Sequence, residues 1–279
     1  MPIAGLTRKF LTANLQRRLR LDTVAPFITT DFSEAIQGPQ DSVVLPTPNT
    51  ITTNDYTVSI KTTVEEDPGY STPTLTMDHQ RSFSFVIPGN SNAMQYIQEH
   101  ADSAFEDLLK ENDEYVFAEA DPASTGNMTA GDINFTVGTD DPKELAKSVE
   151  VNLGESGVRM NAANRFMVVT PALAGELGDF VEETGFNRAD EVNEFGFMGV
   201  IRGTRVFRAE STQFVNVTGA RACFYGIQSK LAFAQAVASM NVVDQNALLE
   251  YPGGTGVNGL HIAGVKVIDN AAFGRIIVD

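Results

Sequence analysis

The stretch from Val43 to Ile87 restricts the possible folds of this chain more than any other feature. It is rich in Thr, Val, Pro and Gly, and side chains alternate with period two in Tyr56–Ile60 and Phe83–Ile87, which predicts two strands. Between them, the charged run Glu65–Tyr70 contains the turn signal Pro68-Gly69. A two-stranded ribbon of this kind has little core of its own and is marginal in water, so we expect it to lie on a neighbouring surface.

A long amphipathic helix is predicted directly after this ribbon. Ser91 is a suitable N-cap, and apolar residues then recur every three to four positions over roughly 25 residues. Residues 91–121 hold nine acidic side chains against one Lys, so the opposite face is strongly acidic. The predicted buried stripe consists of Met94, Ile97, Ala101, Phe105, Leu108 and Val116.

The N-terminal segment, residues 1–21, is basic and has no acidic side chain. Leu11, Leu15 and Leu19 recur every four residues and predict a short amphipathic helix. Charge suggests that this arm lies along the acidic helix of its own or a neighbouring subunit, or else faces DNA. The basic side chains expected to make the arm's contacts are Arg8, Lys9, Arg17, Arg18 and Arg20.

The middle of the chain carries clear helix and strand signals. We expect a loop or short hairpin over 121–139, and then a helix that Asp141 caps, with Pro142 in its first turn. A strand at Arg165–Val169 leads into a helix that begins at Thr170-Pro171. Two strands, Phe197–Ile201 and Arg205–Arg208, follow around a turn at Arg202-Gly203-Thr204.

The last third alternates further elements. The patterns predict a helix near Ser229–Ala238 and strands at Ala222–Ile227, Met240–Val243, Leu260–Val267 and Arg275–Val278. Because strands and helices do not alternate as βαβ units, the fold class is α+β.

Composition excludes several classes of protein. The chain of 279 residues has 42% hydrophobic residues, enough for a sizeable core, and a net charge of −16 that disfavours broad attraction to nucleic acid. Cys223 is the only cysteine, so no intrachain disulfide can form. No apolar run has the length of a signal peptide or a membrane span, so we expect synthesis without export and no membrane association.

No motif supports catalysis or cofactor binding. Gly254–Gly259 matches G-x-G-x-x-G, but Pro252-Gly253 precedes it and an alternating segment follows, so a flexible turn is the better interpretation. His79, His100 and His261 have no metal-ligand spacing, and no G-x-S-x-G elbow is present. We expect Cys223 to be buried and structural. The sequence therefore predicts a non-enzymatic protein with no catalytic, cofactor or metal-binding residues.

The order of these elements resembles the tailed-phage major capsid proteins of the Hong Kong 97 type. A basic N-terminal arm, a long two-stranded loop and a long spine helix are followed by the helix at Asp141–Leu153, the step Arg165–Pro171 and a closing strand at Gly264–Val267. The resemblance implies an arm at 1–36, an extended loop at 37–90, a peripheral domain with the spine helix at 91–138, an axial domain at 139–220 and a return to the peripheral domain at 221–279.

The resemblance also implies a function. Such chains form hexamers and pentamers that tile an icosahedral shell around double-stranded DNA, with the extended loop lying over a neighbour. It implies a virion protein that is assembled in the host cytoplasm, with portal and possibly decoration proteins as partners. We expect a separate scaffolding protein or an already trimmed chain, because the long helical N-terminal extension of relatives with a fused scaffold is absent, and Met1 favours the first.

Five side chains are candidates for the intersubunit interface: Lys61, Glu65, Glu66, Tyr70 and Arg81. Some relatives crosslink a loop Lys to a neighbour's Asn. Lys61 is the only Lys between Val43 and Ile87, but nothing else in the sequence is specific to such a bond, and we do not expect it.

Two alternatives stay open. An encapsulin-like compartment shell shares the fold but encloses protein cargo, and genes for portal and terminase, or DNA in the particle, would separate the two. An acidic α+β enzyme with a carboxylate-based site would instead show a deep pocket with convergent titratable groups.

Overall fold

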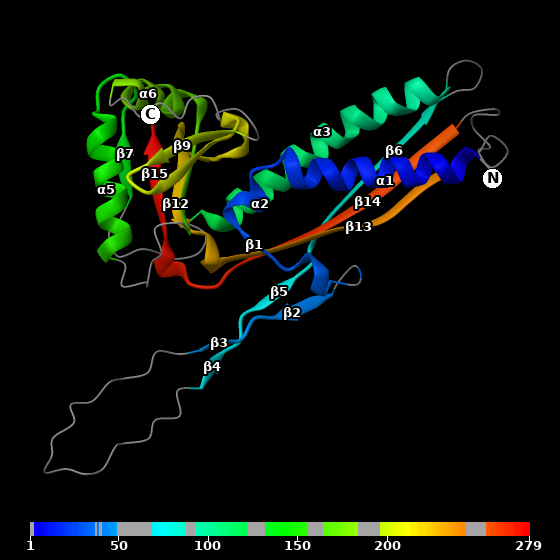
Figure 1. The fold of residues 1–279 in the computed structure, drawn as a ribbon, viewed down its shortest axis with the longest axis horizontal. Helices are drawn as coiled ribbons and strands as arrows, with labels where there is room; N and C mark the ends of the chain where they lie inside the picture. Colours follow the sequence, from blue (N-terminus) through cyan, green and yellow to red (C-terminus); the bar gives the residue numbers. More distant parts are fainter. Residues whose placement is uncertain are drawn as a thin grey trace, which may run out of the picture.

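The computed structural model of this chain describes residues 3–36, 38, 41–48, 69–87, 93–121, 132–155, 164–183, 196–243 and 255–279. The fold is α+β, as predicted, with two large sheets and two small two-stranded ones among the described residues (Figure 1). The α-helices are α1 (Ile3–Leu21), α2 (Ala25–Ile28), α3 (Ala93–Ala120), α5 (Pro142–Glu155) and α6 (Pro171–Glu183). Short 3-10 turns occur at η1 (Ser33–Ala35), η4 (Ser211–Gln213), η5 (Gln228–Lys230) and η6 (Asn270–Ala272).

A long four-stranded sheet forms one part of the molecule. Its strand order is β1 (Thr30–Asp31), β13 (Leu231–Val243), β14 (Thr255–Val267) and β6 (His79–Ile87). β14 is antiparallel to both neighbours, whereas β1 is parallel to β13. Helices α1 and α3 run along one face of this sheet (Figure 1). We call the apolar contacts between them the peripheral cluster: Leu11, Leu15, Leu19, Ile97, Ala101, Phe105, Leu108, Leu109, Met240 and Val257.

The second sheet has seven strands. Its order is β7 (Ile133–Phe135), β15 (Phe273–Val278), β12 (Ala220–Ile227), β8 (Arg165–Val169), β10 (Thr204–Arg208) and β9 (Phe197–Ile201), and β11 (Val215–Val217) also pairs with β12. Helices α5 and α6 pack beside it, and their stripes at Leu145, Val149, Leu153, Leu173 and Leu177 are buried in what we call the axial cluster. Residues 221–279 thus contribute to both sheets, β12 and β15 to this one and β13 and β14 to the other.

Helix α3 joins the two clusters. The residues of its first half, such as Ile97 and Phe105, belong to the peripheral cluster, whereas Val116, Phe117 and Ala120 belong to the axial cluster. The ring of Phe117 lies 5.4 Å from Phe214 and 5.3 Å from Phe224 of the seven-stranded sheet region. The predicted apolar stripe is confirmed from Ile97 onward and is longer than expected, since the helix has 28 residues.

Local signals in the middle of the chain placed elements correctly. Asp141 caps α5, because its Oδ1 accepts a 2.8 Å hydrogen bond from Lys143 N. Pro171 begins α6 directly after β8, as predicted. Between β9 and β10, Arg202 and Gly203 have φ values of 48° and 78°, the left-handed pair of a two-residue hairpin turn.

The predicted helix near Ser229–Ala238 is wrong. Ser229 and Lys230 belong to the turn η5, and the rest of the segment opens β13, a strand of 13 residues. Leu231 to Ala234 are all buried, because Leu231 and Phe233 face the axial cluster while Ala232 and Ala234 face the opposite side. The alanine-rich composition favours a helix, but pairing with β14 along its whole length and burial on both faces override that propensity.

Two further expectations need correction. Phe83–Ile87 is a strand, but it belongs to β6 and pairs with β14 in the four-stranded sheet rather than with the other half of the ribbon; Tyr56–Ile60 lies outside the described residues. The segment Gly256–Gly259 lies within strand β14, not in a turn. A Cβ at Gly259 would lie 2.5 Å from the ring of Phe83. The glycine therefore leaves room for this ring to lie over the neighbouring strand.

The segment 121–139 contains a strand where a loop or hairpin was expected. Within its described residues, Ile133–Phe135 forms β7 and pairs in parallel with β15 at the edge of the seven-stranded sheet. Its partner is distant in the sequence, so no local turn signal announces the pairing.

A buried ion pair fastens the end of α3 to the seven-stranded sheet. Arg275 on β15 donates to both carboxylate oxygens of Asp121, from Nε at 2.8 Å and from Nη2 at 2.6 Å. The exposed fractions of the two side chains are 9% and 4%. Hydrogen bonding to Asp121 raises the pKa of Arg275. A second carboxylate lies near the same guanidinium, with Asp132 Oδ2 3.7 Å from Arg275 Nη1. Two N–H···O bonds in parallel give this contact a defined geometry.

Removing one partner of this pair is predicted to be costly. Arg275→Met should lower the free energy of unfolding by ~3–5 kcal/mol, because it leaves the carboxylate of Asp121 buried without its cation. Lys147→Met is the matched control: it breaks the exposed Lys147–Glu144 pair and should cost less than ~1 kcal/mol. Urea unfolding of both variants is the measurement, and similar small losses in the two would contradict the account.

Candidate functional site

A two-stranded stalk projects from the four-stranded sheet. It consists of β2 (Ser42–Val44) paired with β5 (Thr74–Thr76), and of β3 (Thr47–Pro48) paired with β4 (Tyr70–Ser71), both antiparallel. Figure 1 shows these strands extending away from both sheets. The stalk is the described part of the ribbon expected from the sequence.

Only the root of the stalk is packed against its own chain. Leu45, Leu75 and Met77 are buried there, in a small cluster with Ala232, Ala234 and Ile262 of the four-stranded sheet. Backbone hydrogen bonds fix the same region, from Leu45 N to Pro73 O at 2.9 Å and from Met77 N to Asp41 O at 3.1 Å. The root therefore holds the direction in which the stalk leaves the body.

Large apolar side chains on the stalk are exposed. Tyr70 is 71% exposed and Val44 is 55% exposed, and both lie on paired strands rather than in loops. Burying such side chains contributes roughly 1.5–3 kcal/mol each, which this chain does not gain from its described residues. The stalk thus offers apolar area to another surface.

The structure describes two of the five predicted interface residues, Tyr70 and Arg81. Tyr70 is on the stalk, whereas Lys61, Glu65 and Glu66 lie outside the described residues. Arg81 is on β6, and its Nε lies 3.0 Å from Glu111 Oε2 on α3 of the same chain. The structure therefore gives Arg81 a contact within its own chain.

The basic arm folds along α3. Arg18 Nη2 of α1 lies 3.1 Å from Asp102 Oδ1 of α3, which realises the contact with the acidic helix of its own subunit. Arg8, Lys9 and Arg17 remain exposed; the side chain of Arg20 is outside the described part. The exposed acidic residues on α3 are Glu99, Glu106, Asp107, Glu111 and Glu114.

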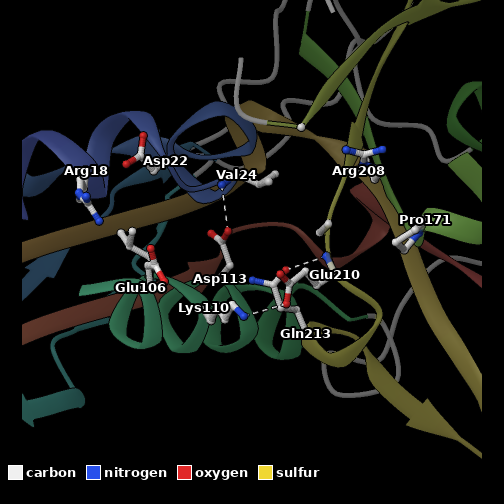
Figure 2. A pocket seen from close by; sticks show the side chains of 13 residues that line it. Arg18, Asp22, Val24, Glu106, Lys110, Asp113, Pro171, Arg208, Glu210 and Gln213 are labelled. Carbon is white, nitrogen blue, oxygen red and sulfur yellow. Dashed lines mark hydrogen bonds and ion pairs between the residues drawn. The ribbon is translucent and has the colours of Figure 1, made fainter. Parts of the chain in front are cut away.

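A charged cleft lies where α1 and α3 meet the segment after β10. Its volume is about 780 Å³. Lys110 Nζ on α3 reaches Glu210 Oε2 at 3.2 Å and so bridges the two sides, as Figure 2 shows. The residues that line the cleft are Arg18, Asp22, Val24, Glu106, Leu109, Lys110, Asp113, Pro171, Gly196, Arg208, Ala209, Glu210 and Gln213.

Asp113 is the unusual group of this cleft. Its side chain is buried, and its two oxygens accept hydrogen bonds from Val24 N and Ala25 N, each at 3.0 Å (Figure 2). Burial raises the pKa of Asp113 to about 7, and the two backbone hydrogen bonds oppose that shift. The carboxylate therefore ties the corner between α1 and α2 to the middle of α3.

The charged groups Asp113, Lys110 and Glu210 of the cleft have partners within the chain. Asp113 is occupied by two backbone amides and Lys110 by Glu210. Cys223 is buried, as predicted, and burial raises the pKa of its thiol to about 12. In the described ranges, no three His, Cys, Asp or Glu side chains are grouped as metal ligands would be.

The sequence held an overlooked signal for this site. Asn112 and Asp113 interrupt the apolar stripe of α3 and yet lie on its buried side, between Leu109 and Val116. Polar residues in such positions need internal partners. The partners of Asp113, which are backbone amides 88 and 89 residues away, could not be inferred from spacing.

The fold is that of tailed-phage major capsid proteins, as the resemblance implied. The capsid structure of cyanophage P-SCSP1u has a TM-score of 0.60 at 11% identity, over 93% of this chain and 89% of that one. The capsid of Ralstonia phage GP4 has a TM-score of 0.59 at 14% identity, over 90% and 86%. A virus-like particle from Pyrococcus furiosus has a TM-score of 0.53 at 13% identity, over 100% of both chains.

These structural likenesses have no counterpart in sequence. No protein-family model matches the chain, and no curated protein is significantly similar to it. In the described part of the chain, the helices lack the length and apolarity that crossing a membrane requires.

The raised pKa of Asp113 predicts a pH dependence with a definite sign. The folded state binds its proton more tightly than the unfolded state, so this stabilisation is present at low pH and is lost as pH rises from about 4 through about 7. The loss approaches ~1.4 kcal/mol per pH unit within that window. Asp113→Asn should remove this component from the pH profile of unfolding.

The test is urea unfolding of the wild type and the variant between pH 4.5 and 7.5. As pH rises, the free energy of unfolding of the variant should increase relative to that of the wild type. Asp107→Asn, at an exposed position on the same helix, should follow the wild type. Parallel profiles for the wild type and Asp113→Asn would show that this carboxylate is not the group responsible.

Proposed function

We propose that this chain is a structural, non-enzymatic shell subunit of a tailed-phage capsid, which assembles into hexamers and pentamers around double-stranded DNA. The observation that carries the proposal is the combination of two facts. The fold matches phage capsid structures over about nine tenths of the chain, and the stalk exposes apolar side chains that the described residues of its own chain do not cover.

The arrangement of elements suits a subunit that tiles a surface. Helix α3 connects two packed bodies, so displacement of one is transmitted to the other. The stalk projects beyond both (Figure 1). An antiparallel ribbon with exposed apolar residues binds by packing across a neighbour or by adding to its sheet. We infer that a second copy of this chain supplies that surface.

The division into parts that the resemblance implied is retained as a proposal. It consists of an arm at 1–36, an extended loop at 37–90, a peripheral domain at 91–138, an axial domain at 139–220 and a return at 221–279. The pairing of β6 with β14 favours assigning residues 79–87 to the peripheral domain.

The partners follow from the same proposal. Packaged DNA is bound without sequence specificity, a portal and a separate scaffolding protein take part in assembly in the host cytoplasm, and a decoration protein is a further candidate. The exposed basic side chains of Arg8, Lys9 and Arg17 could contact either DNA or the acidic surface of a neighbouring copy. The final location is the virion.

A shell that encloses protein cargo is the second candidate. The virus-like particle from Pyrococcus furiosus matches this chain over its full length, but at a lower TM-score than the phage capsids, so the phage capsid is the favoured shell. Nucleic acid in particles purified after nuclease treatment would separate the two shells: protected double-stranded DNA supports the phage capsid, and cargo protein without DNA supports the compartment.

The enzyme alternative predicted a deep pocket with convergent titratable groups, and the charged cleft is the feature that would fit it. Its most perturbed group, Asp113, has both oxygens engaged by backbone amides, and Lys110 is paired with Glu210. Groups held in this way support a structural role for the cleft.

Electron microscopy of the purified full-length protein is the direct test of a shell subunit. We expect closed shells or capsomer rings in negative stain. Uniformly small, compact particles at all protein and salt concentrations would contradict the proposal.

The stalk should be required for assembly but not for folding. The double variant Tyr70→Ala and Val44→Ser removes two exposed apolar side chains, so the thermal midpoint of the unassembled subunit should stay within ~2 °C of the wild type while the yield of particles falls at least severalfold. Val151→Ser, at a position that is 45% exposed on α5, controls for the loss of any exposed apolar side chain. Normal yield from the stalk variant would sink this part of the proposal.

A further inference from the structure

Four polar side chains are enclosed between α3 and the four-stranded sheet. Asn112 is 0% exposed and His261 is 1% exposed, while His79 and Gln235 are partly buried. Among the described residues, no protein partner lies in hydrogen-bonding position to Nε2 of His79, to either polar atom of the Asn112 amide, to Oε1 of Gln235 or to either nitrogen of His261.

Strand register places three of these side chains on one face of the sheet. Ala263 of β14 lies between His79 of β6 and Gln235 of β13, and His261 is two positions earlier on β14. Paired residues share a face and side chains alternate with period two along a strand, so the side chains of His79, Gln235 and His261 point to the same side as that of Ala263. That side faces α3, because the ring of His79 stacks on Tyr115 at a centroid distance of 4.2 Å.

The fourth side chain comes from α3 itself. Asn112 lies three residues before Tyr115, on the same side of the helix and completely buried. Gln235 extends the contact to α1, because its Nε2 donates to Leu19 O at 3.2 Å. The cluster therefore lies where both helices meet the sheet.

Unpaired polar atoms in such a position are costly. A buried donor or acceptor without a partner costs ~1–3 kcal/mol, and native proteins usually satisfy such groups with ordered water that makes about three hydrogen bonds. The four side chains have six nitrogen or oxygen atoms without a hydrogen-bond partner among the described residues. These atoms could donate to and accept from one or two water molecules.

We propose that Asn112, His79, Gln235 and His261 hold buried water that fastens α3 to the sheet while both histidines are neutral, and that acidification releases this fastening. The inference concerns a device within the subunit and goes beyond the proposed shell function. Its ligand is water, and its effector is the proton.

The surroundings make protonation of the cluster unfavourable in the closed structure. Burial lowers the pKa of His261 to about 4, with a further contribution from His79. Burial, followed by the charge of Arg81, lowers the pKa of His79, against the opposing effects of Glu111 and Asp78. The other charged or titratable groups on the elements around the cluster are Asp113, Tyr115 and Glu119 of α3, Lys266 of β14, and Arg18 and Asp22 at the end of α1. Of these, Asp113 titrates in the same pH range with the opposite sign.

The sign of the effect follows from these directions. A histidine whose folded pKa lies below its unfolded value stabilises the fold fully above pH 6.5, and this stabilisation is lost as pH falls toward 4. For one such group, the equilibrium constant for opening rises by up to tenfold per pH unit, or roughly 15-fold between pH 6.5 and 5.

Hydrogen exchange on the full-length protein tests the acid response. In the Asp113→Asn variant, which lacks the opposing titration of that carboxylate, exchange in α3 after correction for intrinsic rates should accelerate at pH 5 relative to pH 7, by roughly 20-fold for one histidine. Exchange in α5, in the other part of the molecule, should not accelerate. The assembly state must be the same at both pH values, as checked by light scattering, so that the result does not depend on the proposed shell function.

Variants identify the responsible group. His261→Gln should abolish most of the acceleration in α3, and His79→Gln, at a less buried position, should reduce it. His100→Gln is the matched control, because His100 is exposed on α3 and contacts only the ring of Phe85 among the described aromatic pairs. An undiminished response in both His261→Gln and His79→Gln would overturn the proposal.

A second measurement tests the water. Asn112→Leu keeps the size of the side chain but removes its donors and acceptors. If water links Asn112 to the histidines, the urea midpoint at pH 7.5 should fall, because the water and its other partners lose a hydrogen bond. An unchanged or higher midpoint would mean that Asn112 is unhydrated and would overturn the proposed cluster.

Discussion

The apolar stripe of α3 is the constraint on which the rest of the structure depends. A helix of 28 residues is about 42 Å long, longer than one small core can cover. Its first half is buried against α1 and the four-stranded sheet, and its last turns are buried in the axial cluster. The two bodies are therefore held at a fixed separation by one element, and the Arg275–Asp121 pair fixes where that element ends.

The polar groups of α3 add specificity to this packing. Asp113 accepts hydrogen bonds from two backbone amides at the corner between α1 and α2. Asn112 is buried in the apolar stripe beside it. Their pH responses have opposite signs, because a buried carboxylate favours its proton and a buried imidazole rejects it. The two titrations span nearly the same range, about pH 4 to 7, so their contributions to the stability of the junction oppose each other there.

Elements with local chemical signals could be predicted from the sequence. The stripe of α3, the cap and proline of α5 and the Arg202-Gly203 hairpin turn each follow from residues within a few positions of one another. Strand β13 could not be predicted, because its alanine-rich sequence favours a helix and only pairing with β14 and burial on both faces make it a strand. β7 was not predicted, and β6 was predicted as a strand but with the wrong partner, because the partners of both strands are distant in the chain.

The candidate site was predictable in kind but not in detail. The lack of a core in the ribbon was evident from composition, and Tyr70 lies exposed on the stalk as that argument requires. The contact of Arg81 with Glu111 could not be predicted, because the sequence does not show that β6 runs beside α3. Asp121 and Arg275 are 154 residues apart, so their pairing exists only in the folded chain.

The central claim is that the stalk is completed by another copy of this chain. A cryo-electron microscopy reconstruction of the assembled particle, at a resolution that shows side chains, tests it most directly. The account predicts that Tyr70 and Val44 are buried against a neighbouring subunit. A stalk that lies free in solvent, or folds back on its own subunit, would contradict it.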